Sequence, residues 1–289
     1  MFFEQVMNGL TIGAIYILLA SGLTIVFGLQ GVVNVAHGIF YMLGAYLAID
    51  LYPHIGLPLT IAVVFAAVAG FGLIVERSAV RPLVNRGRDA VQVLIVTLGV
   101  AIIASELTKI VWGPVPRLSE VPPALSGSVR FLGLTYPVYW LFVIVFTAAL
   151  MATLGLAFNF TTLGAMVQAS ALDPETAQAM GINVPAINSI VFGLGAGVAG
   201  VAGVLAGPIL SVYPTMCFDL LMILFVIVIL GGLGSLLGVV VSGLLVGLVN
   251  AFGVAYLNGT TGTICVFAVM IAVLVVRPLG LLGRSGILN

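Results

Sequence analysis

The sequence predicts an all-α fold, a polytopic bundle of transmembrane helices that forms one domain over residues 1–289. The chain is 62% hydrophobic with a mean hydropathy of +1.32. Only 6% of its residues are charged, whereas soluble domains average about 25%. Its apolar residues are also gathered in long runs separated by short polar links. Because so few charges cannot cover a water-exposed surface, most of the protein surface is expected to face lipid.

Nine of the apolar runs approach the length of about 20 residues that a helix needs to cross the hydrocarbon core. The predicted spans are residues 8–28, 36–52, 57–75, 91–111, 138–157, 187–207, 220–236, 238–257 and 262–277. The second and the seventh could instead be half-helices or re-entrant segments. We therefore expect about nine crossings, within a range of eight to ten, with broken or re-entrant helices among them.

The basic residues predict the orientation of the bundle. The link after the third span and the C-terminal tail carry Arg77, Arg81, Arg86, Arg88, Arg277 and Arg284. The opposite face carries only Lys109, Arg117 and Arg130. Because cytoplasmic segments are enriched in Lys and Arg, we expect the N-terminus outside and the C-terminus in the cytoplasm. This arrangement requires an odd number of crossings.

Two polar links are long enough to form structures of their own. Residues 112–137 contain several prolines, which a helix interior excludes, so they are expected to form an extended extracytoplasmic loop. Residues 158–186 lie on the cytoplasmic side in the same topology. Their pattern allows one short helix over residues 163–170 and a second that begins near residue 173.

Local signals define the second of these helices. Asp173 can cap its N-terminus, Pro174 suits the first helical position, and Glu175 complements the helix dipole. Gly181 supplies a stop signal. The sequence therefore predicts two short helices, joined near Ala171, on the inner face of the membrane.

These short helices have an apolar side. It consists of Thr161, Met166, Ala169, Leu172 and Met180. An exposed apolar patch of this kind is typical of a docking surface for another protein. The alternative is a helix that lies flat on lipid, but such helices are usually rich in Lys and Arg, and this one has neither. The composition favours docking.

A polar island interrupts the apolar sequence at residues 34–38, which read Asn-Val-Ala-His-Gly. Polar side chains at membrane depth are costly unless they are paired or line a wet cavity. We therefore expect a helix break near the inner end of the second span. Asn34, His37 and Gly38 either line a solute path or satisfy backbone groups that the break frees. Thr24, on the first span, either faces the path or bonds its own helix backbone.

Glycines mark two further places. Gly193, Gly197, Gly200, Gly203 and Gly207 share one face of the sixth span and would allow another helix to approach closely. The stretch with Gly231, Gly232 and Ser235 has two interpretations. It could unwind a span and expose carbonyl groups to solute, or it could form a tight turn between two helices.

The sequence also argues against several classes of function. The net charge is zero, so the chain has no basic footprint for nucleic acid. No Cys/His cluster suggests a metal site, and no convergent acid, base or nucleophile suggests an enzyme. No Gly-x-x-x-x-Gly-Lys-Ser/Thr loop occurs, so ATP would have to be bound by another subunit. A stand-alone channel or secondary transporter remains an alternative, although only Glu106 could be an intramembrane coupling carboxylate.

Four stretches together carry a family pattern. They are residues 22–28 leading into 31–38 and 41–46; residues 76–77 with 81–83; residues 173–184 leading into 193–203; and residues 230–238 followed by 277–284. The Asn34-x-Ala-His-Gly38 and Gly181-Ile-Asn-Val184 stretches are the most distinctive. With their spacing over nearly the whole chain, they resemble the permease subunits of bacterial branched-chain amino acid ATP-binding cassette importers, close to the LivH type.

The resemblance implies an inner-membrane permease that imports a small neutral or zwitterionic solute. A branched-chain or other apolar amino acid is favoured, and amides or urea are the alternative. The implied partners are a second homologous permease subunit, either a paralogue or a copy of this chain, two cytoplasmic ATPase subunits that bind ATP and Mg²⁺, and an extracytoplasmic solute-binding protein. The residues implied for coupling to the ATPase are Gly164, Ala165, Ala169, Asp173, Pro174, Glu175, Ala179 and Gly181. From the residues themselves, the candidates for the solute pathway are Thr24, Asn34, His37, Gly38, Gly231, Gly232 and Ser235.

Overall fold

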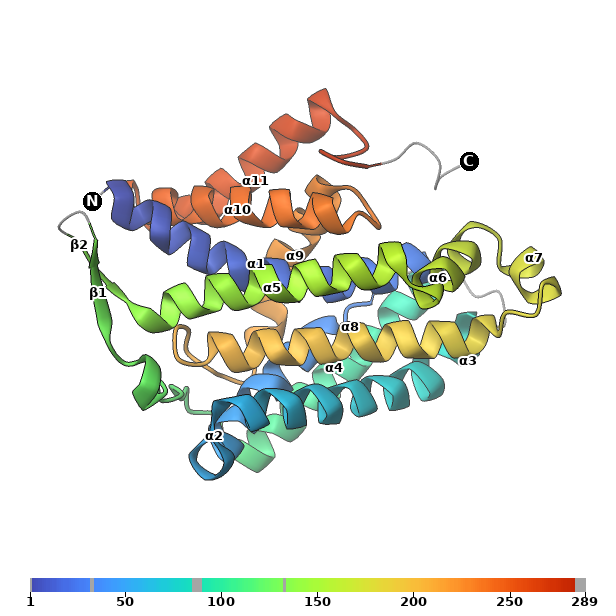
Figure 1. Cartoon of the computed structure of the whole chain (residues 1–289), viewed down its shortest axis with the longest axis horizontal. Coiled ribbons are helices and arrows are strands. Elements are labelled where there is room, and N and C mark those ends of the chain that lie inside the picture. The colour runs from blue at the N-terminus through green and yellow to red at the C-terminus, as the bar shows by residue number, and fades with distance from the viewer. Residues whose placement is uncertain (1, 32–33, 85–89, 132–133, 284–289) are drawn as a thin grey trace.

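The structure is a computed structural model that describes residues 2–31, 34–84, 90–131 and 134–283 (Figure 1). Arg86, Arg88 and Arg284, which entered the orientation argument, lie outside the described residues. The membrane-scale helices are α1 (Phe2–Gln30), α2 (His37–Val75), α4 (Ala90–Trp112), α5 (Val138–Phe160), α8 (Val184–Ala206), α9 (Met216–Gly231), α10 (Leu236–Tyr256) and α11 (Gly259–Val276). The shorter elements are the π-helix η1 (Glu76–Val80), α3 (Arg81–Val84), the 3-10 helix η2 (Pro123–Leu125), β1 (Ser128–Phe131), β2 (Leu134–Pro137), α6 (Thr162–Leu172) and α7 (Pro174–Ala179).

The predicted class, an all-α polytopic membrane protein, is confirmed. Within the described residues, six helical segments are long and apolar enough to cross a membrane: α1, the continuous run from α2 to α3, α4, α5, α8 and α10. Helices α9 and α11 are apolar but shorter. The count of nine crossings stays a prediction, because length alone does not decide how the shorter segments and the long α2 run cross the bilayer.

Helix α2 contains both the second and the third predicted span. As one straight helix its 39 residues would measure about 58 Å, nearly twice the thickness of the hydrocarbon core. Gly56 interrupts it with φ 72° and ψ 167°, a conformation that only glycine adopts readily. Figure 1 shows the chain turning there, at the end of the bundle where the N-terminus lies. The helix therefore has two arms, residues 37–55 and 57–75.

Helices α1 and α8 form the buried centre of the bundle. Both arms of α2 pack against α8, where the glycine face makes room for them. A Cβ atom at Gly203 would lie 2.7 Å from the backbone nitrogen of Ala45, and one at Gly200 would lie 3.0 Å from Cβ of Val68. The expected role of this glycine face, close helix approach, is therefore confirmed.

The helix break at the polar island lies beside the interior of α1. His37 begins α2 beside the carbonyl oxygen of Leu19, which is 3.0 Å from its Nε2 atom, and Leu19 lies well inside α1 rather than at its inner end. The break therefore lies at the first residues of α2, where the sequence predicts it. Whether this end of α2 is the inner one stays a prediction.

Helix α9 begins in the same interior region. The seventh predicted span, 220–236, is displaced, because α9 starts at Met216 and ends at Gly231. Gly38, at the start of α2, lies against the backbone of Cys217, at the start of α9. A Cβ atom on Gly38 would be 3.0 Å from the Cys217 carbonyl carbon. Two helices that are far apart in sequence therefore begin side by side inside the bundle.

The two ends of the bundle carry different structures. The predicted external loop, 112–137, is extended as expected and adds the antiparallel hairpin of β1 and β2, with Tyr136 of the hairpin 3.1 Å from the hydroxyl of Thr11. The helices α6 and α7 project from the other end (Figure 1). The start of α1 and residues 277–283 lie at opposite ends, as an odd number of crossings requires. Which end is cytoplasmic stays a prediction.

Candidate functional site

The polar side chains of the island contact backbone groups of the break and of α1. The side chain of His37 is fully buried and contacts the ring of Phe40 edge-on, in addition to its contact with Leu19. The Oδ1 atom of Asn34 accepts a hydrogen bond of 3.0 Å from the amide of Ala36. Because a break leaves amides such as that of Ala36 without helical partners, this geometry supports the structural interpretation of Asn34. His37 ties the start of α2 to a carbonyl inside the continuous helix α1, which is also a structural role.

Three polar atoms of the expected pathway have no hydrogen-bond partner among the described residues. They are Thr24 Oγ1, Asn34 Nδ2 and His37 Nδ1. Thr24 therefore does not bond its own helix backbone, in contrast to Ser21, which donates to Leu18. These three atoms keep the solute-pathway interpretation open.

The structural role of His37 predicts a graded response to substitution. His37→Ala should lower the thermal unfolding temperature of the purified chain by several degrees, because it removes a buried ring and its hydrogen bond to the Leu19 carbonyl. His37→Gln, whose amide can donate to that carbonyl, should recover part of the loss. Unfolding followed by tryptophan fluorescence checks this. Equal unfolding temperatures for all three proteins, with transport altered in His37→Ala, would instead place the ring on the solute path.

The glycine stretch after α9 forms a tight turn. Gly232 and Gly234 have φ angles of 97° and 79°, and the Ser235 hydroxyl accepts a hydrogen bond of 3.1 Å from the amide of Gly238 as the cap of α10. The carbonyl of Gly231 accepts a 3.1 Å hydrogen bond from Leu282. Of the two interpretations of this stretch, the geometry therefore supports the turn, since these residues connect two helices and one carbonyl is already bonded.

The two expected short helices are present as α6 and α7. Asp173 caps α7 by accepting hydrogen bonds from the amides of Glu175 and Thr176 at 3.1 and 3.0 Å, and Pro174 is the first helical residue. Gly181 follows with φ 88°. Gly164 is buried, and a Cβ atom there would lie 2.7 Å from Cα of Phe158, so it lets α6 fold back tightly onto the end of α5.

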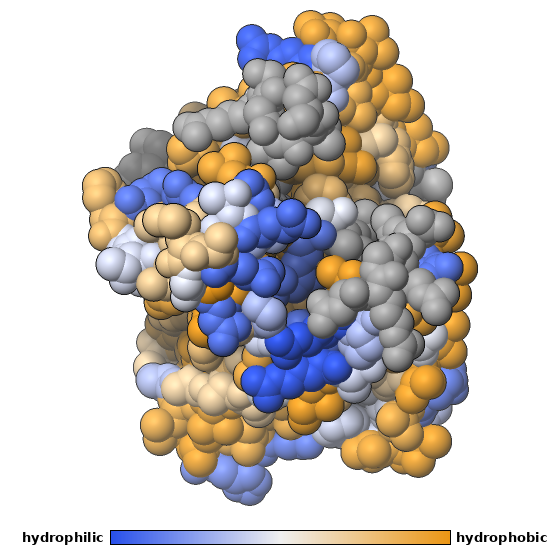
Figure 2. Space-filling model, turned by 90° about the vertical axis from the view of Figure 1, so that its right-hand side faces the viewer, coloured by the Kyte–Doolittle hydropathy of each residue, from blue (hydrophilic) through white to orange (hydrophobic). Residues whose placement is uncertain are grey.

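These helices expose apolar side chains, as the sequence predicts. Leu172 and Met180 are 75% and 80% exposed, and Leu163 and Met166 are also exposed. Ala165 and Ala179 are exposed too, whereas Ala169 is half-buried. Figure 2 looks onto this end of the molecule and shows polar side chains gathered in its middle, with apolar residues around them. The arrangement suits contact with another protein.

The cap of α7 should respond to pH. Hydrogen bonds from the hydroxyl and the amide of Thr176 hold the pKa of the Asp173 carboxyl below its usual value. A lowered pKa means that the carboxylate stabilises α7 above the pKa of the unfolded chain, and that this contribution is lost as the pH falls through the folded value. Hydrogen exchange of residues 174–181, corrected for intrinsic pH effects, should therefore be faster in Asp173→Ala than in the parent at neutral pH. The two should converge in acid, and a constant difference across pH would contradict the cap.

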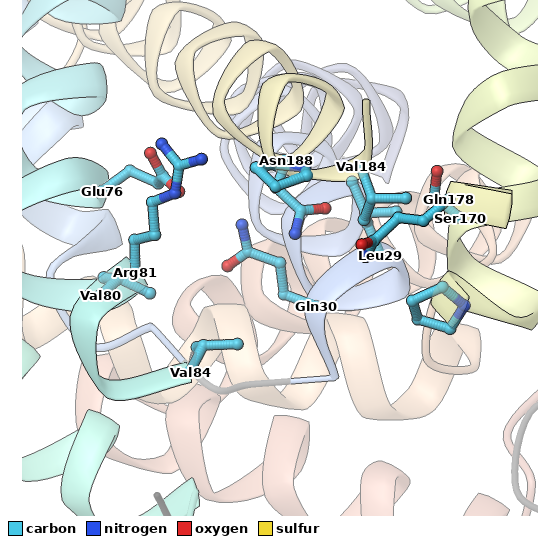
Figure 3. A pocket seen from close by; sticks show the side chains of 12 residues that line it. Leu29, Gln30, Glu76, Val80, Arg81, Val84, Ser170, Gln178, Val184 and Asn188 are labelled. Carbon is cyan, nitrogen blue, oxygen red and sulfur yellow. The ribbon is translucent and has the colours of Figure 1, made fainter. Parts of the chain in front are cut away.

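One functional candidate was not singled out from the sequence. Glu76, at the start of the π-helix η1, is only 2% exposed and accepts a 2.8 Å hydrogen bond from the hydroxyl of Ser189. It borders a cavity between α1, α2 and α8 and the pair α6–α7 (Figure 3). A carboxylate at the end of an apolar span was the signal in the sequence that could have identified Glu76, and π-helical turns are frequent at functional sites.

The described residues hold no group of three or more His, Cys, Asp or Glu side chains suited to a metal ion.

The long apolar helices and the helices that start inside the bundle define the class, an all-α polytopic membrane protein. Residues 5–274 match the model of the family described as branched-chain amino acid transport system / permease component, and the chain belongs to this family. The resemblance seen in the sequence is thereby confirmed.

Individual relatives cover almost the whole chain. It is 34% identical to the high-affinity branched-chain amino acid transport system permease protein BraD of Pseudomonas aeruginosa, over 98% of this chain and 96% of that protein. It is 32% identical to LivH of Escherichia coli over the same shares. It is also 28% identical to the permease protein LivM of Escherichia coli, over 94% of this chain and 68% of that protein. No solved structure matches it.

Proposed function

We propose that this chain is the membrane-spanning permease subunit of an ATP-binding cassette importer. It moves a small neutral or zwitterionic solute into the cell, and a branched-chain or other apolar amino acid is the favoured substrate. The observation that carries this proposal is the family membership, together with nearly full-length similarity to permeases of branched-chain amino acid transport systems. The scarcity of charged residues agrees with a solute of no net charge.

The energy source lies on partner subunits in this proposal. The sequence has no phosphate-binding loop, so two cytoplasmic ATPase subunits bind ATP and Mg²⁺, and this chain binds no cofactor itself. Helices α6 and α7 contact an ATPase subunit through their exposed apolar side, which includes Leu172 and Met180. Under this proposal Gly164, Asp173, Pro174 and Gly181 shape the element, as its geometry supports.

The assembly also contains a second homologous permease and an extracytoplasmic solute-binding protein. The similarity to both LivH and LivM allows the second permease to be a paralogue or a copy of this chain. The complex lies in the bacterial inner membrane, with the N-terminus outside, the C-terminus in the cytoplasm and nine crossings. The solute passes near the break where α2 and α9 begin, beside Thr24, Asn34 and His37.

Reconstitution tests the proposal. The two permeases, the ATPases and the binding protein are assembled in liposomes, and ATP hydrolysis and uptake of radiolabelled leucine are measured together. We expect leucine with its binding protein to raise ATP hydrolysis severalfold, and uptake to require ATP. Acetamide and urea serve as the comparison solutes. Uptake that persists without any ATPase subunit would overturn the proposal in favour of a channel or secondary transporter.

A further inference from the structure

A cavity of about 220 Å³ lies between α6–α7 and the inner ends of the central helices. Its walls come from distant parts of the chain: Gln30 ends α1, Arg81 begins α3, Ser170 lies in α6 and Asn188 in α8. Figure 3 shows Glu76 and Arg81 on one side, Ser170 and Gln178 on the other, and Gln30 and Asn188 between them. The cavity thus joins the coupling helices to the helix bundle.

One wall of the cavity carries charges of both signs. The carboxylate of Glu76 is almost fully buried, and the described residues give its side chain a single hydrogen-bond donor, the hydroxyl of Ser189. An ionised carboxylate can accept about four hydrogen bonds, and a buried charge is stable only with polar or charged partners. The guanidinium group of Arg81 borders the same cavity, but these two described side chains form no ion pair. Each charge is therefore available to a ligand.

The other walls offer unused hydrogen-bonding atoms. Ser170 is 1% exposed, and its hydroxyl has no partner among the described residues. The Oδ1 atom of Asn188 is also buried and without a partner in that part of the chain. Such atoms normally have partners in a folded protein. Aliphatic side chains, including Leu29, Val80 and Val184, complete the lining.

We propose that this cavity binds a free amino acid with an apolar side chain, taken up from the cytoplasmic side. The ammonium group of the amino acid pairs with Glu76 and its carboxylate with Arg81, while its side chain contacts the aliphatic lining. Two opposite charges on one wall match the adjacent charges of a zwitterion, and charge-assisted hydrogen bonds of this kind are strong. The unpaired atoms of Ser170 and Asn188 complete the contacts.

The position of the cavity gives such a ligand a regulatory effect. A bound amino acid bridges α6–α7 to α1, α3 and α8, so it restrains the helices that contact the ATPase. Accumulated solute in the cytoplasm then slows its own import. This inference rests on the proposed function for the cytoplasmic location of the cavity and for the role of α6–α7, but the binding itself requires no ATPase.

Binding of radiolabelled L-leucine to the full-length chain in lipid nanodiscs tests the site. We expect saturable binding that Glu76→Gln and Arg81→Gln each weaken by at least about tenfold, which corresponds to about 1.4 kcal/mol. L-Leucinamide, which lacks the carboxylate, and N-acetyl-L-leucine, which lacks the ammonium group, should compete poorly. The matched controls are Arg77→Gln and Glu120→Gln, since both residues are exposed and lie outside the cavity. They should bind leucine as the parent does.

A variant that keeps Glu76 and Arg81 distinguishes loss of the binding site from misfolding of the chain. Asn188→Leu adds an aliphatic side chain to the cavity from α8 and should also abolish the cavity-dependent binding while the chain stays monodisperse. Leucine binding that survives Glu76→Gln, Arg81→Gln and Asn188→Leu would overturn the proposal. If transport in the reconstituted complex is normal in that case, the proposed function stands and only the cavity assignment fails.

The headgroup of phosphatidylethanolamine also combines a primary ammonium with an acid group. Nanodiscs with and without this lipid distinguish the two sources of the same chemistry. Leucine binding of equal affinity in both supports a free amino acid, whereas leucine binding that phosphatidylethanolamine abolishes would assign the cavity to lipid. In the reconstituted complex without binding protein, leucine on the ATPase side should lower basal ATP hydrolysis in the parent and not in Arg81→Gln. No inhibition in the parent would overturn the regulatory effect.

Discussion

Gly44→Ala is expected to destabilise the chain strongly, although alanine is the better helix former. The added Cβ atom would meet the carbonyl oxygen of Gly200 and lie 2.6 Å from the Cα atom of the same residue. Both are backbone atoms of the buried helix α8, so no side chain can rotate away. Overpacking of a dense core typically costs about 1–3 kcal/mol, and the backbone displacement needed here places this variant at or above the upper end of that range. Folded protein recovered after detergent extraction, together with its unfolding temperature, measures the effect.

The matched control for Gly44→Ala lies on the same helix. Gly70 belongs to the second arm of α2, and a Cβ atom there meets nothing within 4 Å. Gly70→Ala should therefore gain the helix propensity of alanine, worth about 1 kcal/mol or less, and raise the unfolding temperature slightly. If the two variants behave alike, the close packing of α2 on α8 is not what stabilises the bundle.

Ala179→Arg is expected to abolish leucine uptake while ATP hydrolysis continues. Ala179 is the last residue of α7 and is exposed, so an arginine can be accommodated without disturbing the bundle. In the proposed assembly it would place a charge in an apolar contact with the ATPase, and a charge buried in an interface without a partner is costly. We expect uptake to fall by at least about tenfold. Uptake and hydrolysis are measured in the same liposomes.

Two variants separate an interface effect from a general one. Ala179→Ser changes the size of the side chain little and should transport normally. Ala124→Arg introduces the same charge at an exposed position of the external loop, at the other end of the bundle, and should leave the coupling of ATP hydrolysis to uptake unchanged. Full uptake by Ala179→Arg would show that α7 does not contact the ATPase.

Local signals in the sequence were sufficient to predict those structures that depend only on neighbouring residues. The cap formed by Asp173, the start at Pro174 and the stop at Gly181 are all present around α7, because capping involves residues only a few positions apart. The glycine face of α8 was also readable, since helical spacing alone places its members on one side. Family membership could be inferred for the same reason, because it rests on the order of residues.

The position of the helix break within the bundle and the set of residues that line the cavity could not be predicted from local sequence signals. The sequence located the break at residues 34–38 but not its position beside the interior of α1, because that position depends on how the helices pack. The contact between His37 and Leu19 shows this position. The boundaries of α9 shifted for a related reason, since a uniform apolar run gives no signal for where its helix begins.

By itself the sequence determined the class of this protein, its family and the two short helices at one end, because composition, periodicity and capping are properties of the chain order. The tertiary structure alone decided that α2 and α9 begin beside each other in the interior. It also brought Glu76, Arg81, Ser170 and Asn188 around one cavity. Glu76 and Arg81 are neighbours in the sequence, but Ser170 and Asn188 lie about 90 or more residues further on. Only the packing of the helices determines the distances between these two pairs.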